Sequence, residues 1–223
     1  MKQLQEYIDH TLLRPDASLV DIQKACKEAI DHSFYAVCIE RRFLSQMTPA
    51  LKKGGVRAVT VVGFPSGEES TEDKVAQTLE AVQDGADEID MVLNRTLLKE
   101  KLYVAVLEDV QAVVKAAEGR LVKVILETSE LTNEEKISAC ALSVAAGASF
   151  VKTSTGFSKH GATVDDVRLM KQTVGYGVGV KASGGIRDRQ TALEMIAAGA
   201  SRLGTSASIA IVESQSPSDN SGY

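Results

Sequence analysis

Three segments of the chain repeat one pattern, and this repeat constrains the fold more than any other feature of the sequence. AVQDGADEIDMV, SVAAGASFVKTS and MIAAGASRLGTS each read as a helix end, a glycine, an alanine, a polar residue and then a strand. Gly85, Gly147 and Gly199 stand where helices commonly end with a left-handed residue. The repeat therefore predicts β–α units that follow one another along the chain.

Eight strand candidates alternate with helical patterns. Such alternation indicates a parallel sheet, and for a chain of 223 residues we predict an α/β fold closed into a single-domain (β/α)8 TIM barrel. An open, doubly wound sheet is the alternative, but the G-x-G-x-x-G motif that usually follows its first strand is absent. The expected strands cover residues 9–13, 35–40, 58–64, 88–94, 122–128, 150–155, 178–183 and 202–205.

The barrel domain is expected over residues 1–211. Residues 212–223, VESQSPSDNSGY, are polar and carry no periodic pattern, which is typical of a flexible tail. Inside the domain, the helix expected over residues 73–83 carries an apolar face made of Val75, Ala76, Leu79 and Val82. The pattern predicts that this face packs on the core.

The composition argues against several kinds of partner. A net charge of −5 leaves no broad basic surface for nucleic acid or anionic lipid, and no apolar run is long enough to span a membrane. The three cysteines are sparse and form no CxxC pair, which favours the reducing cytoplasm over a disulfide framework. The three histidines lack the spacing of metal ligands, so no metal site is expected.

Two lysines stand inside expected strands, in FVKTSTG and in GVGVKASGG. Because strand side chains alternate between two faces, Lys152 shares its face with Ser154, and Lys181 shares its face with Ser183. The lysines could instead point outward and extend between the helices. We favour the interior, because barrel enzymes place their chemistry at the carboxyl ends of the strands.

The two lysines belong to the sixth and seventh strands, and adjacent parallel strands lie about 5 Å apart. Two ammonium groups this close cannot both stay charged cheaply, so the pKa of at least one should fall. A neutral lysine amine forms a Schiff base with an aldehyde or ketone. Asp90, on the interior face of the fourth strand, can move protons in the same cavity. Together, Lys152, Lys181 and Asp90 predict imine chemistry.

Two small-residue loops follow the seventh and eighth strands, SGGI and GTSAS, and each precedes an expected helix. Backbone N–H groups at helix N-termini bind anions, and barrel enzymes often hold phosphate after these two strands. The alternative is that the glycines only permit tight turns, but two such loops at the expected pair of strands favour phosphate. The predicted substrate-binding residues are Gly184, Gly185, Gly204 and Ser206, with further donors from Thr155 and Gly156.

KTSTG, VKASGG, EIDMV, VKVILET and VVGFP together resemble the deoxyribose-phosphate aldolases, a family of class I aldolases, over nearly the whole chain. The resemblance implies that Lys152 forms the Schiff base and that Asp90 and Lys181 donate and accept protons. It implies a phosphosugar substrate, 2-deoxyribose 5-phosphate, which the family cleaves reversibly to glyceraldehyde 3-phosphate and acetaldehyde. The implied role is deoxyribose phosphate catabolism in the cytoplasm, without a metal or an organic cofactor.

The resemblance extends to three further positions. Asp9 and Thr11, in DHTLL, match residues that line the cavity, and the final residue, Tyr223, matches a tyrosine that assists proton transfer. The chain departs from the family at Phe157, where some members carry a phosphate-contacting lysine. Lys159 is the nearest replacement.

Several questions stay open at this point. A sugar-phosphate isomerase or epimerase is one alternative function, although it would need a carboxylate base and not two interior lysines. A non-catalytic phosphosugar-binding barrel and an aldolase with another substrate preference are the others. A homo-oligomer, either a dimer or a tetramer, is also open.

Overall fold

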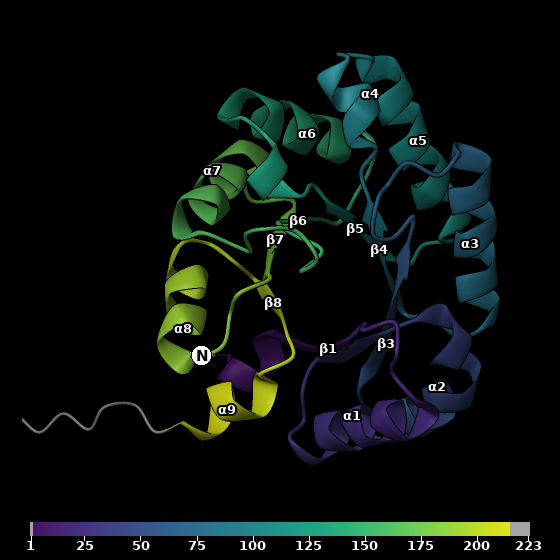
Figure 1. Cartoon of the computed structure of the whole chain (residues 1–223), viewed down its shortest axis with the longest axis vertical. Coiled ribbons are helices and arrows are strands. Elements are labelled where there is room, and N and C mark those ends of the chain that lie inside the picture. The colour runs from purple at the N-terminus through teal and green to yellow at the C-terminus, as the bar shows by residue number, and fades with distance from the viewer. Residues whose placement is uncertain (1, 215–223) are drawn as a thin grey trace, which may run out of the picture.

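A computed structural model describes residues 2–214 and shows a closed barrel of eight parallel strands inside a ring of helices (Figure 1). Each strand pairs with the next one in sequence, and β8 pairs with β1. The predicted (β/α)8 barrel is therefore confirmed, and the open sheet is wrong. The strands are β1 Ile8–Leu12, β2 Ala36–Ile39, β3 Arg57–Val62, β4 Glu88–Val92, β5 Leu121–Ile125, β6 Phe150–Lys152, β7 Gly179–Ser183 and β8 Arg202–Thr205.

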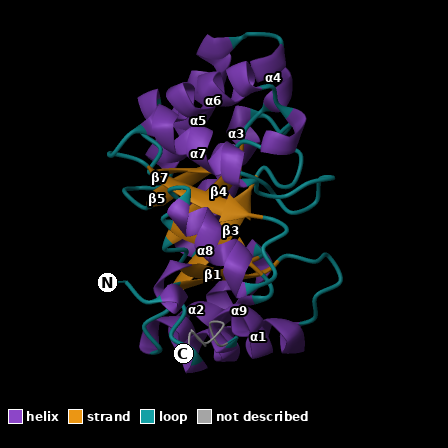
Figure 2. Cartoon of the chain, turned by 90° about the vertical axis from the view of Figure 1, so that its left-hand side faces the viewer, coloured by secondary structure: helices purple, strands orange, loops and turns teal. Residues whose placement is uncertain are grey.

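Helices cover the outside of the barrel, so that the strands form an inner layer with helices around it (Figure 2). The last helix includes the first two residues of the expected tail, and residues 215–223 lie outside the described part of the chain. No helix in residues 2–214 is long and apolar enough to cross a membrane. The helices are α1 Leu19–Asp31, α2 Leu44–Lys53, α3 Thr71–Gln83, α4 Arg95–Lys99, α5 Tyr103–Ala116, α6 Asn133–Ala145, α7 Val164–Val174, α8 Arg189–Ala197 and α9 Ser208–Glu213.

The repeated glycines end their helices as predicted. Gly85, Gly147 and Gly199 directly follow the C-cap residues of α3, α6 and α8, with φ values of 93°, 88° and 117°. A residue with a Cβ adopts this conformation at a cost, which glycine avoids. The repeat thus marks the points where the chain leaves a helix and enters the next strand.

Two strands end three residues earlier than predicted. β6 ends at Lys152 and not at residue 155, and β5 ends at Ile125 and not at residue 128. The chain turns away after β5 because Glu127 has a left-handed backbone with φ of 59°. As a result, Lys152 is the last residue of its strand and lies at the carboxyl edge of the barrel.

Helix α3 buries a different face from the one predicted. Lys74, Thr78 and Ala81 are buried, whereas Leu79 is 40% exposed. The Lys74 ammonium lies 2.7 Å from the carboxylate of Asp109 on α5, so the buried charge is paired. The apolar pattern of α3 predicted the wrong face because it contains no information about Asp109, which lies on another helix and pairs with Lys74.

Candidate active site

The carboxylate of Asp90, on β4, accepts hydrogen bonds from three lysines inside the barrel. Its Oδ2 lies 2.8 Å from Nζ of Lys152 and 2.9 Å from Nζ of Lys181. Its Oδ1 lies 2.7 Å from Nζ of Lys123. All four side chains are at least 98% buried, so these contacts form in a setting of low dielectric, where they are strong.

The contacts continue around the interior. Lys181 also bonds Oδ2 of Asp9 at 2.5 Å, and Lys123 lies 2.6 Å from Oε2 of Glu88. Arg202, from β8, joins the two carboxylates, at 2.9 Å from Asp9 and 3.1 Å from Glu88. One continuous network results, which we call the buried charge cluster: Asp9, Glu88, Asp90, Lys123, Lys152, Lys181 and Arg202.

The predicted placement of the two lysines is confirmed. Lys152 and Lys181 are paired residues of adjacent strands, and both point inward. Lys123 and Arg202 were not predicted from the sequence. Lys123 alternates with valines in β5, so the same face argument would have found it, whereas Arg202 opens a short strand that carries no such signal.

Asp90 stays ionised in this setting. Burial alone would raise the pKa of its carboxyl, but the charges of Lys123, Lys152 and Lys181 outweigh burial and hold the pKa well below its usual range. Asp90 is therefore a fixed negative charge next to the amine of Lys152.

Lys181 stays protonated inside the buried charge cluster. Burial alone would lower its pKa, but the carboxylates of Asp9 and Asp90 outweigh burial and raise the pKa above the ordinary value. The lowered pKa that is predicted for at least one of the two lysines therefore does not occur at Lys181.

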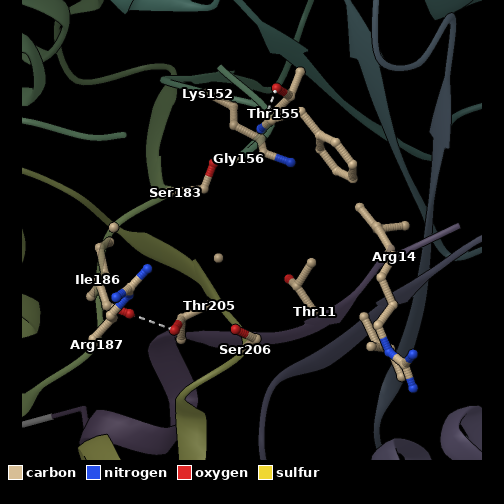
Figure 3. A pocket seen from close by; sticks show the side chains of 16 residues that line it. Thr11, Arg14, Lys152, Thr155, Gly156, Ser183, Ile186, Arg187, Thr205 and Ser206 are labelled. Carbon is tan, nitrogen blue, oxygen red and sulfur yellow. Dashed lines mark hydrogen bonds between the residues drawn. The ribbon is translucent and has the colours of Figure 1, made fainter. Parts of the chain in front are cut away.

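A cavity of about 340 Å³ opens at the carboxyl ends of the strands (Figure 3). Of the three lysines in the buried charge cluster, Lys152 alone lines this cavity. Asp90 lies behind it and contacts its amine, and Lys181 contacts the same carboxylate oxygen of Asp90. Asp9 also lies behind the wall, and Tyr223 is outside the described residues. The other predicted substrate-binding residues all line the cavity: Thr11, Thr155, Gly156, Gly184, Gly185, Gly204 and Ser206.

The loop after β7 differs from expectation at the start of its helix. The N-terminus of α8 is capped by the carboxylate of Asp188, whose Oδ1 accepts from the amide of Thr191 at 2.9 Å. Asp188 therefore takes up one amide of this helix terminus, and the binding of an anion after β7 stays a prediction. The loop amides of Gly184 and Gly185 and the side chain of Arg187 lie at the cavity.

Gly204 has a packing role as well as a place in the cavity wall. A Cβ atom at this position would lie 3.0 Å from Cε of Lys181 and 2.9 Å from Cβ of Ser183. The missing side chain therefore leaves room for Lys181 to reach its carboxylates. This second reason for a glycine was not visible in the sequence.

Cys38, on the interior face of β2, is fully buried, and burial raises the pKa of its thiol to about 11. It is therefore neutral at physiological pH and unsuited to act as a nucleophile. Within residues 2–214, no group of three His, Cys, Asp or Glu side chains is arranged to hold a metal ion.

The fold and the site define a class of protein, a (β/α)8-barrel enzyme whose cavity at the carboxyl ends of the strands is backed by a lysine–carboxylate cluster. A family model described as DeoC/LacD family aldolase matches residues 4–211. The chain belongs to this family and is an aldolase, an enzyme of the lyase class. The family predicted from the five sequence motifs is confirmed.

Individual relatives cover nearly the whole chain. The deoxyribose-phosphate aldolase of Clostridium tetani is 51% identical over 212 residues, which make up 95% of this chain and 98% of that protein. The deoxyribose-phosphate aldolase of Finegoldia magna is 53% identical over 211 residues, with 95% and 99% covered. The tetrameric deoxyribose phosphate aldolase of Aeropyrum pernix superposes with a TM-score of 0.89 at 34% identity, with 94% of this chain and 89% of that chain covered. The oligomeric state of this chain stays a prediction.

Proposed function

We propose that this aldolase cleaves 2-deoxy-D-ribose 5-phosphate reversibly to D-glyceraldehyde 3-phosphate and acetaldehyde, through a Schiff base on Lys152. The observation that carries the proposal is the position of Lys152, which is the one lysine of the buried charge cluster that lines the cavity and can meet a substrate there. The names of the relatives support the substrate. We further propose that the reaction serves the catabolism of deoxyribose phosphate.

The charge balance of the cluster supports Lys152 as the nucleophile. Three carboxylates face four buried cationic groups, so one positive charge is in excess when every group is ionised. An uncompensated buried charge is costly. Lys181 and Lys123 each contact two carboxylates, whereas Lys152 contacts only Asp90. Lys152 is therefore the cationic group that the carboxylates compensate least, which supports its amine as the one that attacks a carbonyl.

The proposed reaction begins when this amine adds to C1 of the open-chain sugar and loses water, which gives an iminium. Loss of the C3 hydroxyl proton breaks the C2–C3 bond, the electron pair passes into the enamine, and glyceraldehyde 3-phosphate leaves. Protonation of the enamine carbon and hydrolysis release acetaldehyde and restore Lys152.

Asp90 suits this sequence as an electrostatic partner. Its Oδ2 lies 2.8 Å from the nitrogen that becomes the iminium, so it stabilises the positive charge as this develops. Because its pKa is held so low, Asp90 is a weak base by itself. We propose that a water next to Asp90 takes the hydroxyl proton and that Lys181 completes the relay.

The direct test is a retro-aldol assay on 2-deoxyribose 5-phosphate, combined with borohydride reduction. Cleavage together with a reduced adduct on Lys152 supports the proposal. Isomerisation or epimerisation without a trapped adduct would contradict it, because that chemistry needs no imine.

The cavity wall opposite Lys152 is proposed to hold the phosphate, through the amides of Gly184 and Gly185, the side chain of Arg187 and the exposed Ser206. Ser206→Asp places a negative charge against the phosphate, so KM for the phosphosugar should rise roughly 10- to 100-fold. Steady-state kinetics measure this effect. Ser201→Asp adds the same charge at the opposite, amino end of β8 and should leave KM unchanged. Equal KM values in the two variants would contradict a phosphate site at this wall.

Tyr223 is proposed to assist protonation of the enamine carbon. Deletion of this residue should slow hydrogen–deuterium exchange into acetaldehyde by about tenfold or more, since general acid catalysis contributes factors of that size or larger. The exchange is followed by NMR, and the melting temperature should not change. Exchange at the wild-type rate in the truncated chain would remove Tyr223 from the mechanism.

A further inference from the structure

Glu127 is a buried carboxylate that lies outside the buried charge cluster and was not singled out in the sequence. It lies two residues after the end of β5, is 2% exposed and directly precedes the 3-10 helix Thr128–Glu130. Its backbone has φ of 59° and ψ of 62°, in the left-handed region. A non-glycine residue in this conformation, at a buried position, indicates a constraint that the surrounding structure maintains.

Three other non-glycine residues in the described part of the chain have positive φ, and each has a simple explanation. Ser33, Lys101 and Glu118 are exposed, and each follows the C-cap of a helix, where a left-handed residue is common. Glu127 precedes a helical turn and does not end one. Helix termination therefore does not account for its conformation.

The carboxylate of Glu127 joins the end of β5 to the loop that follows β6. Oε2 accepts from the amide of Thr155 at 3.3 Å and from the hydroxyl of Thr155 at 2.5 Å. Oε1 accepts from the hydroxyl of Ser158 at 2.7 Å. These three neutral donors offset the cost of burying the carboxylate and tie it to one loop.

This loop forms the cavity wall beside the lysine. Residues 153–163 contain no helix or strand and begin directly after Lys152. Thr155, Gly156 and Phe157 line the cavity, and the Thr155 hydroxyl oxygen also accepts from the amide of Phe157 at 3.1 Å. Figure 3 shows Thr155 and Gly156 next to Lys152. The carboxylate thus bonds directly to Thr155 and Ser158, the residues on either side of Gly156 and Phe157.

Residues 153–163 also pack against the loop after β7, which is proposed to bind the phosphate. The amide of Ala162 donates to the carbonyl oxygens of Ser183 and Gly184, at 3.1 Å and 3.0 Å. A Cβ atom on Gly161 would overlap the carbonyl of Gly184, which shows how closely the two backbones approach. Movement of the loop therefore also displaces the residues proposed to bind phosphate.

We propose that Glu127 is a positioning residue for the aldol reaction, whose carboxylate holds residues 153–163 as the wall that orients the phosphosugar over Lys152. The proposal deepens the proposed function and rests on it, since both concern the same cavity. The hydrogen bonds of Glu127 go to the loop, whereas those of Lys152 go to Asp90. Loss of the carboxylate should therefore weaken substrate binding more than imine formation.

Glu127→Gln tests the carboxylate at nearly constant size, because one oxygen becomes an NH2 donor that faces other donors. KM for 2-deoxyribose 5-phosphate should rise at least about tenfold, since small misplacements of a binding wall have effects of this order. The rate constant kcat should change by less than about threefold, and borohydride should still trap acetaldehyde on Lys152. Ser158→Ala removes one of the three bonds and should raise KM by a smaller factor.

A second pair of variants separates the carboxylate from the backbone strain. Glu127→Gly relieves the left-handed conformation and removes the carboxylate, so KM should rise as in Glu127→Gln although the backbone is relaxed. Glu118→Gly makes the same backbone change at an exposed helix end and should leave KM and kcat unchanged. A wild-type KM in both Glu127 variants would overturn the positioning role.

Amide hydrogen exchange gives a readout that does not depend on turnover. Exchange at Thr155 and Phe157 should be at least about tenfold faster in Glu127→Gln than in the wild type, and unchanged in Glu118→Gly. Unchanged exchange in Glu127→Gln, or a loss of kcat that follows thermal stability at constant KM, would overturn the proposal. A wild-type protein that is inactive on the phosphosugar would instead overturn the proposed function, while exchange still decides whether Glu127 holds the loop.

Discussion

Replacement of Lys152 by alanine is expected to lower kcat for 2-deoxyribose 5-phosphate by at least about 10⁴-fold, because no amine remains at the cavity to form the imine. The fold should persist. Asp90 keeps Lys123 and Lys181 as partners, and the vacated space opens on the cavity. Activity is followed by coupled detection of glyceraldehyde 3-phosphate, and folding is followed by circular dichroism.

Mass spectrometry identifies the nucleophile independently of the rate. Wild-type protein that is treated with acetaldehyde and borohydride should carry an N-ethyl group on Lys152, and Lys152→Ala should carry none inside the barrel. An adduct on Lys181 or Lys123 would contradict the assignment, since neither amine lines the cavity in this structure. Substantial turnover by Lys152→Ala would contradict the imine mechanism itself.

Lys181→Leu is expected to lower activity at neutral pH by about 100-fold and to move the acidic limb of the pH–rate profile upward by at least about one pH unit. Lys181 supplies one of the charges that balance Asp9 and Asp90. Without Lys181, the cluster contains three carboxylates, and only Lys123, Lys152 and Arg202 can balance them. The charges therefore balance only when Lys152 is protonated. Because the nucleophile is the neutral amine, activity should then appear only at higher pH. The measurement is kcat/KM as a function of pH.

Lys74→Leu is the matched control for the loss of a buried ammonium. Lys74 pairs with Asp109 between α3 and α5, outside the barrel interior. Lys74→Leu should lose roughly 3–5 kcal/mol of unfolding free energy, because it leaves the buried carboxylate of Asp109 without its cation. Lys181→Leu should lose less, because Asp9 keeps Arg202 and Asp90 keeps Lys123 and Lys152. Only Lys181→Leu should change the pH profile. An acidic limb that stays at the wild-type pH in Lys181→Leu would show that Lys181 does not control the charge of Lys152.

Local periodicity explains how much could be predicted. The three glycines marked helix ends because a left-handed backbone has the same residue preference wherever a helix stops. Strand alternation placed Lys152 and Lys181 inside the barrel and in adjacent strands, and the register confirms both expectations. These features depend on residues a few positions apart, so a single sequence contains the information.

The sequence by itself thus determined the barrel, the family and the interior placement of Lys152 and Lys181. Tertiary structure alone decided the electrostatics, because the charge of a buried group depends on every charge near it. Closure of the barrel brings Arg202 to Asp9 across 193 positions of sequence, and the pairing of β4 with β5 brings Lys123 to Asp90. Periodicity tells which way a side chain points, but not which distant strand supplies its counter-charge. The same limit explains α3, where Asp109 on another helix decided that Lys74 would be buried.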